Sequence, residues 1–115
     1  MAEATDLLLW GILAHLVADW PLQTEWMAIH KRNLYHPAAW VHSGVHGISM
    51  ALVFPWYLAI LIAGSHLLID TRKPVMWWMQ HIKGMATDDP HAIIVETGVD
   101  QVVHITVVAL IALSM

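Results

Sequence analysis

The sequence of 115 residues lacks cysteine altogether and carries little charge, since only 12% of its residues are Asp, Glu, Lys or Arg. Without cysteine the chain has no disulfide framework and no thiolate ligand, so any metal site must use nitrogen and oxygen donors. Lysine and arginine total five, and the formal net charge is −4. A chain of this charge lacks the basic surface that binds nucleic acid, and we expect no nucleic-acid partner.

Apolar residues dominate what is present. Hydrophobic residues make up 58% of the chain, seven residues are Trp, and the mean hydropathy is +0.60. A soluble core of this size could not bury so much apolar surface. The composition therefore predicts an integral membrane protein, and the length predicts a single domain over residues 1–115.

Prolines and apolar runs divide the chain into four expected helices. The first ends before Pro21, the second begins at Pro37, and Pro55 marks the turn between the second and the third. Asp89 and Pro90 are typical of an N-cap and a first helical position, and they open the fourth helix. The expected helices cover about residues 5–20, 37–54, 56–71 and 90–114. The first three are at or just below the ~17–25 residues that span a bilayer, so we predict an all-α membrane four-helix bundle.

All the basic residues lie in two connections between these helices. They are Lys31, Arg32, Arg72, Lys73 and Lys83. The positive-inside rule therefore predicts that residues 21–36 and 72–89 are cytoplasmic and that the N- and C-termini lie outside. Residues 75–85 contain Trp77 and Trp78, and we expect them to form a short interfacial helix between helices three and four.

Ionisable residues recur in pairs at spacing i, i+4 within the apolar stretches. The pairs are His15 with Asp19, His42 with His46, His66 with Asp70, and Asp100 with His104. Residues four apart lie on the same face of a helix, so each pair marks one polar face. In the predicted topology these faces lie toward the cytoplasmic ends of the helices. An up-down bundle brings such faces together into one polar cluster.

The residue types of these pairs indicate a metal centre. Aspartate inside a membrane is costly, by roughly 2.5–3.5 kcal/mol at the centre of a span, so intramembrane Asp and His indicate function. Imidazole and carboxylate suit divalent zinc, with manganese and iron as alternatives. The eight side chains exceed the three or four protein ligands of one zinc ion, so either two ions share them or some of them orient the ligands. For a single pair, the alternative is an interhelical hydrogen bond.

The remaining candidate residues, Glu96 and four histidines, lie outside the four pairs. Glu96 precedes Asp100 by four residues, so it extends the polar face of the last helix and is the candidate catalytic base near a metal-bound water. A stabilising interaction with the helix dipole is the alternative explanation of an acidic residue in an early helical turn. The remaining histidines fall in connections or at helix starts, and we place them outside the site. They are His30, His36, His81 and His91.

The run from His15 to Thr24 has the pattern H-x3-D-W-P-L-Q-T, and the other three pairs follow it in order. With these motifs the chain resembles an uncharacterised family, a domain of unknown function, of small bacterial and phage polytopic membrane proteins. The resemblance spans nearly the whole chain. It implies a four-helix fold in the bacterial cytoplasmic membrane and a role for the paired residues, but it supplies no reaction.

The spacing of the pairs is also remotely similar to that of membrane-bound metal-dependent hydrolases and of zinc-dependent phospholipase C. In those proteins such pairs on neighbouring helices bind clustered zinc. This chain differs because it is shorter, begins with Met1 where phospholipase C has a ligating tryptophan, and has no separate substrate domain.

These observations favour a metal-dependent hydrolase that acts on a lipid or phosphate ester at the cytoplasmic leaflet, with Lys31, Arg72 or Lys73 holding the phosphate. One alternative is a structural staple, a membrane subunit whose metal ion only holds the helices together. A small transporter of protons or divalent cations is another, although residues 7–13, 48–62 and 105–115 offer no acidic, basic or histidine side chain for a continuous path. A bundle this short exposes most of its surface to neighbours in the bilayer, so we also expect a homo-oligomer.

Overall fold

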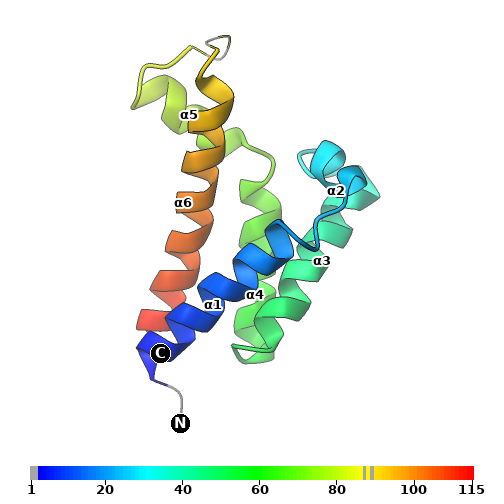
Figure 1. Cartoon of the computed structure of the whole chain (residues 1–115), viewed down its shortest axis with the longest axis vertical. Helices are drawn as coiled ribbons and strands as arrows, with labels where there is room; N and C mark the ends of the chain where they lie inside the picture. The colour runs from blue at the N-terminus through cyan, green and yellow to red at the C-terminus, as the bar shows by residue number, and fades with distance from the viewer. Residues whose placement is uncertain (1–2, 87, 89) are drawn as a thin grey trace.

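The computed structural model describes residues 3–86, 88 and 90–115, which form six helices and no strand. The helices are α1 (Ala4–Asp19), α2 (Glu25–His30), α3 (Pro37–Ala51), α4 (Trp56–Ile69), α5 (Lys73–His81) and α6 (Ala92–Leu113), as labelled in Figure 1. The predicted all-α class is confirmed.

The four expected helices correspond to α1, α3, α4 and α6, with shorter bounds. The helix expected over 37–54 ends at Ala51 because the chain turns before Pro55, and a residue that precedes proline is disfavoured in the helical conformation. The helix expected from Pro90 begins at Ala92. Asp89, its expected N-cap, lies outside the described residues.

Two short helices occupy the connections. The sequence did not predict α2, which begins after Thr24, whose hydroxyl accepts a hydrogen bond from the backbone N–H of Met27. The short helix expected within 75–85 is α5, and Pro74 lies in its first turn. Val75 and Met79 on α5 are buried in one apolar cluster with Ala92 of α6.

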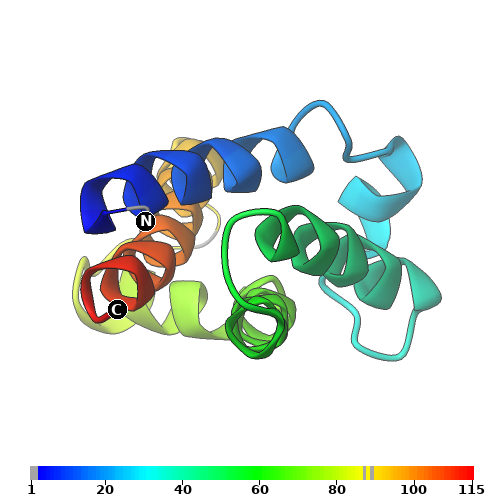
Figure 2. The ribbon, with the colours of Figure 1, turned by 90° about the horizontal axis from the view of Figure 1, so that it is seen from below.

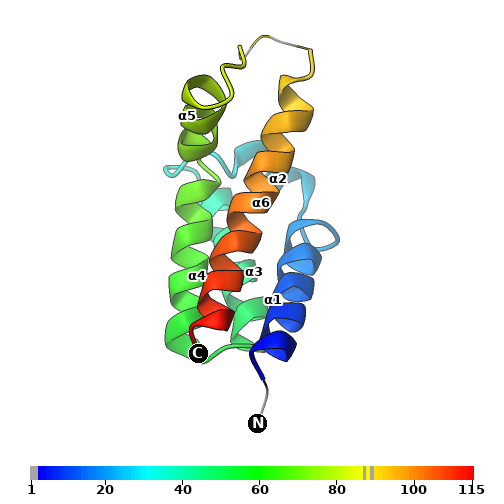
Figure 3. The same cartoon turned by 90° about the vertical axis from the view of Figure 1, so that its left-hand side faces the viewer.

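The four long helices form a closed arrangement in which each contacts two others. α1 packs against α3 and α6, and α4 packs against the same two helices. Viewed along the bundle, α1 lies across one side of it (Figure 2). The start of α1, the α3–α4 turn and the end of α6 lie at one end, while α5 lies at the opposite end (Figure 3).

The apolar core fills the end of the bundle that contains the α3–α4 turn. Its buried members are Met50, Phe54, Ala59, Ile62, Val108 and Ala112. Three of these residues continue the predicted polar faces, because Met50, Ile62 and Val108 each lie four positions from a histidine of a pair. Each of these helices therefore has one inward face that is apolar near this end and polar farther along.

Among the described residues, α6 is the one helix long and apolar enough to cross a membrane, and it has 22 residues. α4 is apolar but has 14 residues. Helix length and composition therefore leave the predicted four-span membrane bundle unestablished. The exterior is nevertheless apolar, with Leu52 86% exposed and Ile48 and Ile94 each 72% exposed.

Gly11 allows α1 to approach α6 and the α3–α4 turn closely. A Cβ atom at this position would lie 2.7 Å from Cγ1 of Val108 and 3.1 Å from Cε2 of Phe54. Both neighbours are buried, so neither can move aside freely.

We expect Gly11→Ala to lower the free energy of unfolding by about 1–3 kcal/mol, because the added methyl overpacks this contact. Gly98→Ala is the matched control, since a Cβ there meets no atom within 4 Å and Gly98 also lies within a long helix. It should stabilise the protein by about 0.5–1 kcal/mol through helix propensity. Chemical unfolding followed by circular dichroism measures both variants, and equal effects would contradict the proposed packing role.

Candidate metal centre

The structure brings all eight paired residues together inside the bundle. His15 and Asp19 come from the last turns of α1, and His42 and His46 from α3. Each of the eight side chains is at most 3% exposed. The remaining four are His66 of α4, Asp70 directly after the end of α4, and Asp100 and His104 of α6.

A first group of donors surrounds one carboxylate oxygen of Asp19. Oδ1 of Asp19 lies 3.2 Å from Nε2 of His42, 3.4 Å from Nε2 of His46 and 3.7 Å from Nε2 of His66. Donors about 2.0–2.1 Å from a tetrahedral zinc ion are separated by roughly 3.4 Å along each edge of the tetrahedron. These four side chains, contributed by α1, α3 and α4, could therefore hold a metal ion.

The short contacts in this group are not aligned as hydrogen bonds. Within the described part of the chain, neither ring nitrogen of His42, His46 or His66 has a hydrogen-bond partner, and neither does Oδ1 of Asp19. A buried polar atom left without a partner costs about 1–3 kcal/mol. One cation between these atoms would satisfy an atom of each side chain at once, so the residues present fit a divalent metal.

A second group of donors surrounds Asp70. Its Oδ2 lies 2.9 Å from Nδ1 of His66 and 3.2 Å from Nε2 of His42. Its Oδ1 lies 3.1 Å from Nε2 of His104. The rings of His66 and His104 stack with their centroids 4.0 Å apart. His66, Asp70 and His104 could also hold a metal ion, and His66 belongs to both groups.

His15 and Asp100 lie beside these groups rather than within them. Nε2 of His15 donates a hydrogen bond to Oε1 of Gln101 at 3.1 Å, and Nε2 of Gln101 donates to Oδ2 of Asp19. This chain of hydrogen bonds orients the carboxylate that faces the first group. The sequence pattern assigned no role to Gln101, because its partners lie on another helix. The metal-ligand role predicted for His15 and Asp100 is untested.

Two buried cations lie near carboxylates of the cluster. Nζ of Lys31 lies 3.9 Å from Oδ1 of Asp19, and Nε of Arg72 lies 3.3 Å from Oδ1 of Asp100. Lys31 also donates a hydrogen bond to Gln23. The sequence pattern predicted Lys31 and Arg72 as phosphate ligands, and it did not predict their ion pairs with these carboxylates. They balance part of the negative charge buried in the cluster.

Glu96, the predicted base, lies in a network of arginines. Its Oε1 is 2.9 Å from Nη2 of Arg32 and 3.1 Å from Nη1 of Arg72. Arg72 has a left-handed backbone, with φ 65°, which is uncommon for a residue with a Cβ atom. The ion pairs of Glu96 are thus with two arginines rather than with a histidine of the cluster. Its catalytic role remains a prediction.

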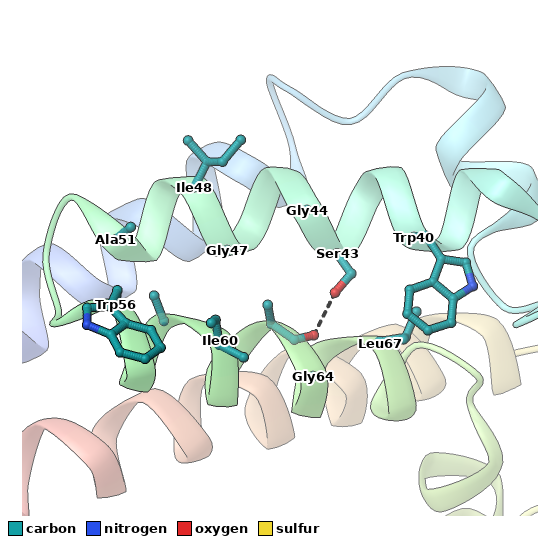
Figure 4. Close-up of a pocket in the computed structure, with 12 residues that line it drawn as sticks. Trp40, Ser43, Gly44, Gly47, Ile48, Ala51, Trp56, Ile60, Gly64 and Leu67 are labelled. Atoms are coloured by element: carbon teal, nitrogen blue, oxygen red, sulfur yellow. Dashed lines mark hydrogen bonds between the residues drawn. The ribbon is translucent and has the colours of Figure 1, made fainter.

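Two grooves open on the outside of the bundle. One, of about 490 Å³, runs along α3 and α4 between Trp40 and Trp56 (Figure 4). Its wall includes the hydrogen bond that Ser43 donates to the carbonyl of Ala63 at 2.6 Å. A second groove, of about 620 Å³, lies between α1 and α3. Neither lining, as described, includes a histidine or an aspartate, so both grooves are separate from the cluster.

The paired residues of the cluster extend over most of the chain. A known family matches the chain over a similar range. The chain belongs to the family described as Protein of unknown function (DUF3307). The family profile matches residues 7–115. No curated protein and no solved structure matches the chain. The expected membership of an uncharacterised family is therefore confirmed, and it brings no reaction with it. The remote similarity to metal-dependent hydrolases stays a prediction.

We expect Gln101→Leu to lower the free energy of unfolding by about 2–4 kcal/mol, because it leaves His15 and Oδ2 of Asp19 buried without their partner. Gln80→Leu makes the same chemical change at an exposed position of α5 and should stay within about 0.5 kcal/mol of the unmutated protein. Denaturant unfolding measures both. Equal stability of the two variants would show that the Gln101 hydrogen bonds do not support the cluster.

Proposed function

We propose that the chain is a membrane protein with a divalent-metal centre that hydrolyses a phosphate ester of a lipid. The observation that supports the metal most directly is the approach of three imidazole nitrogens, from His42, His46 and His66, to one oxygen of Asp19. A buried set of three nitrogens and one oxygen suits zinc, and manganese or iron are the alternatives.

The apolar exterior supports a location in the bilayer. Monomeric soluble proteins rarely expose large contiguous apolar patches. Here large apolar side chains are more than half exposed on all four long helices. They include Leu9, Trp10, Ile48, Trp56, Ile60, Leu61, Ile94, Val102 and Leu110. The same exposed surface supports association with further copies of the chain, so we also propose a homo-oligomer.

The distribution of charge supports an orientation. The basic residues belong to the segments that contain α2 and α5, which lie away from the end formed by the α3–α4 turn (Figure 3). We therefore place residues 21–36 and 72–89 in the cytoplasm and both termini outside, in the cytoplasmic membrane of a bacterium.

Hydrolysis is supported by what surrounds the donors. A bound divalent ion supplies a Lewis acid and lowers the pKa of a coordinated water. Arg32, whose side chain is 49% exposed, and Lys73, which is also exposed, lie at the cytoplasmic side, where they can contact the phosphate of a lipid headgroup. Arg72 extends this basic region inward to Asp100. The cluster and a headgroup phosphate would thus lie at a similar depth.

A structural staple is the second candidate, and one observation favours it. The first group offers four protein donors and is fully buried, as in structural zinc sites, whereas catalytic sites keep one position open. Transport is less well supported, because the interior beyond the cluster is packed with Met50, Phe54 and Val108 rather than polar side chains.

We expect the purified, zinc-loaded protein to hydrolyse a phospholipid or a pyrophosphate-linked lipid, and a chelator to remove this turnover. His46→Ala should lose both metal and turnover, whereas His30→Ala, in the stacked His30–His36 pair outside the cluster, should keep both. Released phosphate or headgroup and metal content are measured on the same samples. Zinc-loaded, folded protein without turnover on either lipid would leave the staple as the function.

The orientation is testable because the chain has no native cysteine. Single cysteines at Asn33 and Gln80 should react with a membrane-impermeant thiol reagent only from the cytoplasmic side. Cysteines at Thr5 and Ser114 should react only from outside. All four positions are exposed, so failure to react reports on the membrane rather than on burial. The reverse labelling pattern would contradict the orientation, and labelling of all four from one side would contradict the membrane-spanning arrangement.

A further inference from the structure

We propose that the cluster holds two metal ions, with the imidazole of His66 shared between them. Asp19, His42 and His46 complete the first site with Nε2 of His66, while Asp70 and His104 form the second site with Nδ1 of His66. This inference goes beyond the proposed function, which requires one ion.

The position of the His66 ring is the first argument. Its Nε2 faces Oδ1 of Asp19 at 3.7 Å, and its Nδ1 faces Oδ2 of Asp70 at 2.9 Å. A neutral imidazole carries one N–H and could donate it to one of these carboxylates. Neither ring nitrogen of His66, however, has a contact with hydrogen-bond geometry. If both nitrogens bind cations, the ring loses its proton to solvent and becomes an imidazolate, whose negative charge the second cation balances.

The distribution of fixed charge is the second argument. Asp19 has Lys31 nearby and Asp100 has Arg72. Among the described residues, the ion-pair partners of Asp70 are three histidines, His42, His66 and His104, and no lysine or arginine. A buried carboxylate without a cation is costly. A metal ion at Asp70 supplies that charge, and a protonated His104 is the competing explanation.

The number of protein donors is the third argument. The first group has four donors, which close a tetrahedral site, whereas the second has three. Three protein ligands leave one position of a tetrahedral ion open, as in catalytic zinc sites. Asp100 lies at the edge of this second site, with Oδ1 3.3 Å from Nε2 of His104 and 3.3 Å from Nε of Arg72. The second ion is therefore the one next to the buried arginine, and the two ions have different tasks.

The experiment counts metal ions bound to the purified full-length chain, with zinc for stoichiometry and Cu(II) for spectroscopy. We expect two ions per chain in the unmutated protein and in His30→Asn, the control outside the cluster. His104→Asn should retain one ion, and His46→Asn should lose the ion of the first site. In the Cu(II) form, an imidazolate bridge couples the two electron spins, so the paramagnetic resonance signal should be weak. His104→Asn should restore the signal of an isolated ion.

The possible outcomes separate this inference from the proposed function. One ion per chain, unaffected by His104→Asn, would overturn the second site and support protonated His104 beside Asp70, while the proposed metal function would stand. No bound ion would overturn both. Two ions with a full, uncoupled Cu(II) signal would overturn the sharing of His66. The count and the signal of the unmutated protein decide these cases even if His104→Asn fails to fold, which circular dichroism reports.

Discussion

Burial of ionisable side chains inside an apolar bundle is the constraint on which the rest of the structure depends. An unpaired charge or imidazole in such an interior is costly, so each one must meet a partner from another helix. The four long helices bring such groups close to one another: Asp19 of α1 lies beside histidines of α3 and α4, and Asp70 after α4 lies beside His104 of α6. These polar contacts between helices determine the helix positions as much as the apolar core does.

The two short helices are explained by the same constraint. Lys31 directly follows α2, and Arg72 directly precedes α5, so each short helix is flanked at one end by a cation that lies near a buried carboxylate. The left-handed backbone of Arg72 fits this explanation, because the chain must turn sharply after α4 while the guanidinium points back toward Asp100 and Glu96. An uncommon backbone conformation is tolerated where the surrounding contacts determine it.

Spacing along the sequence was sufficient to predict the polar cluster. It was not sufficient to assign the residues of the cluster to two groups of metal donors. Pairs four residues apart identify a helix face, which is why His42, His46 and His66 could be predicted to face inward. Spacing does not give the angle at which α1 crosses α3, and that angle decides which histidines reach Asp19. Spacing also gave no role to Gln101 and did not predict the ion pairs of Glu96, because Gln101 contacts Asp19 of α1 and Glu96 contacts Arg32 in the segment after α2. Helix α2 carries too short a pattern for periodicity to reveal it.

The donors form two groups, and this arrangement is compatible with both proposed functions, the structural staple and the hydrolase. A closed group of four donors has no position for a substrate, and by itself it indicates a staple. A neighbouring group of three donors, bordered by Asp100 and Arg72, would leave one position of a tetrahedral ion open, as the proposed hydrolysis requires. The outer grooves are apolar, and the far end of the bundle is filled by Met50 and Phe54. The end that carries Glu96 and the half-exposed Arg32 is instead polar, and in the proposed function it is the side from which a polar ligand would approach the second group.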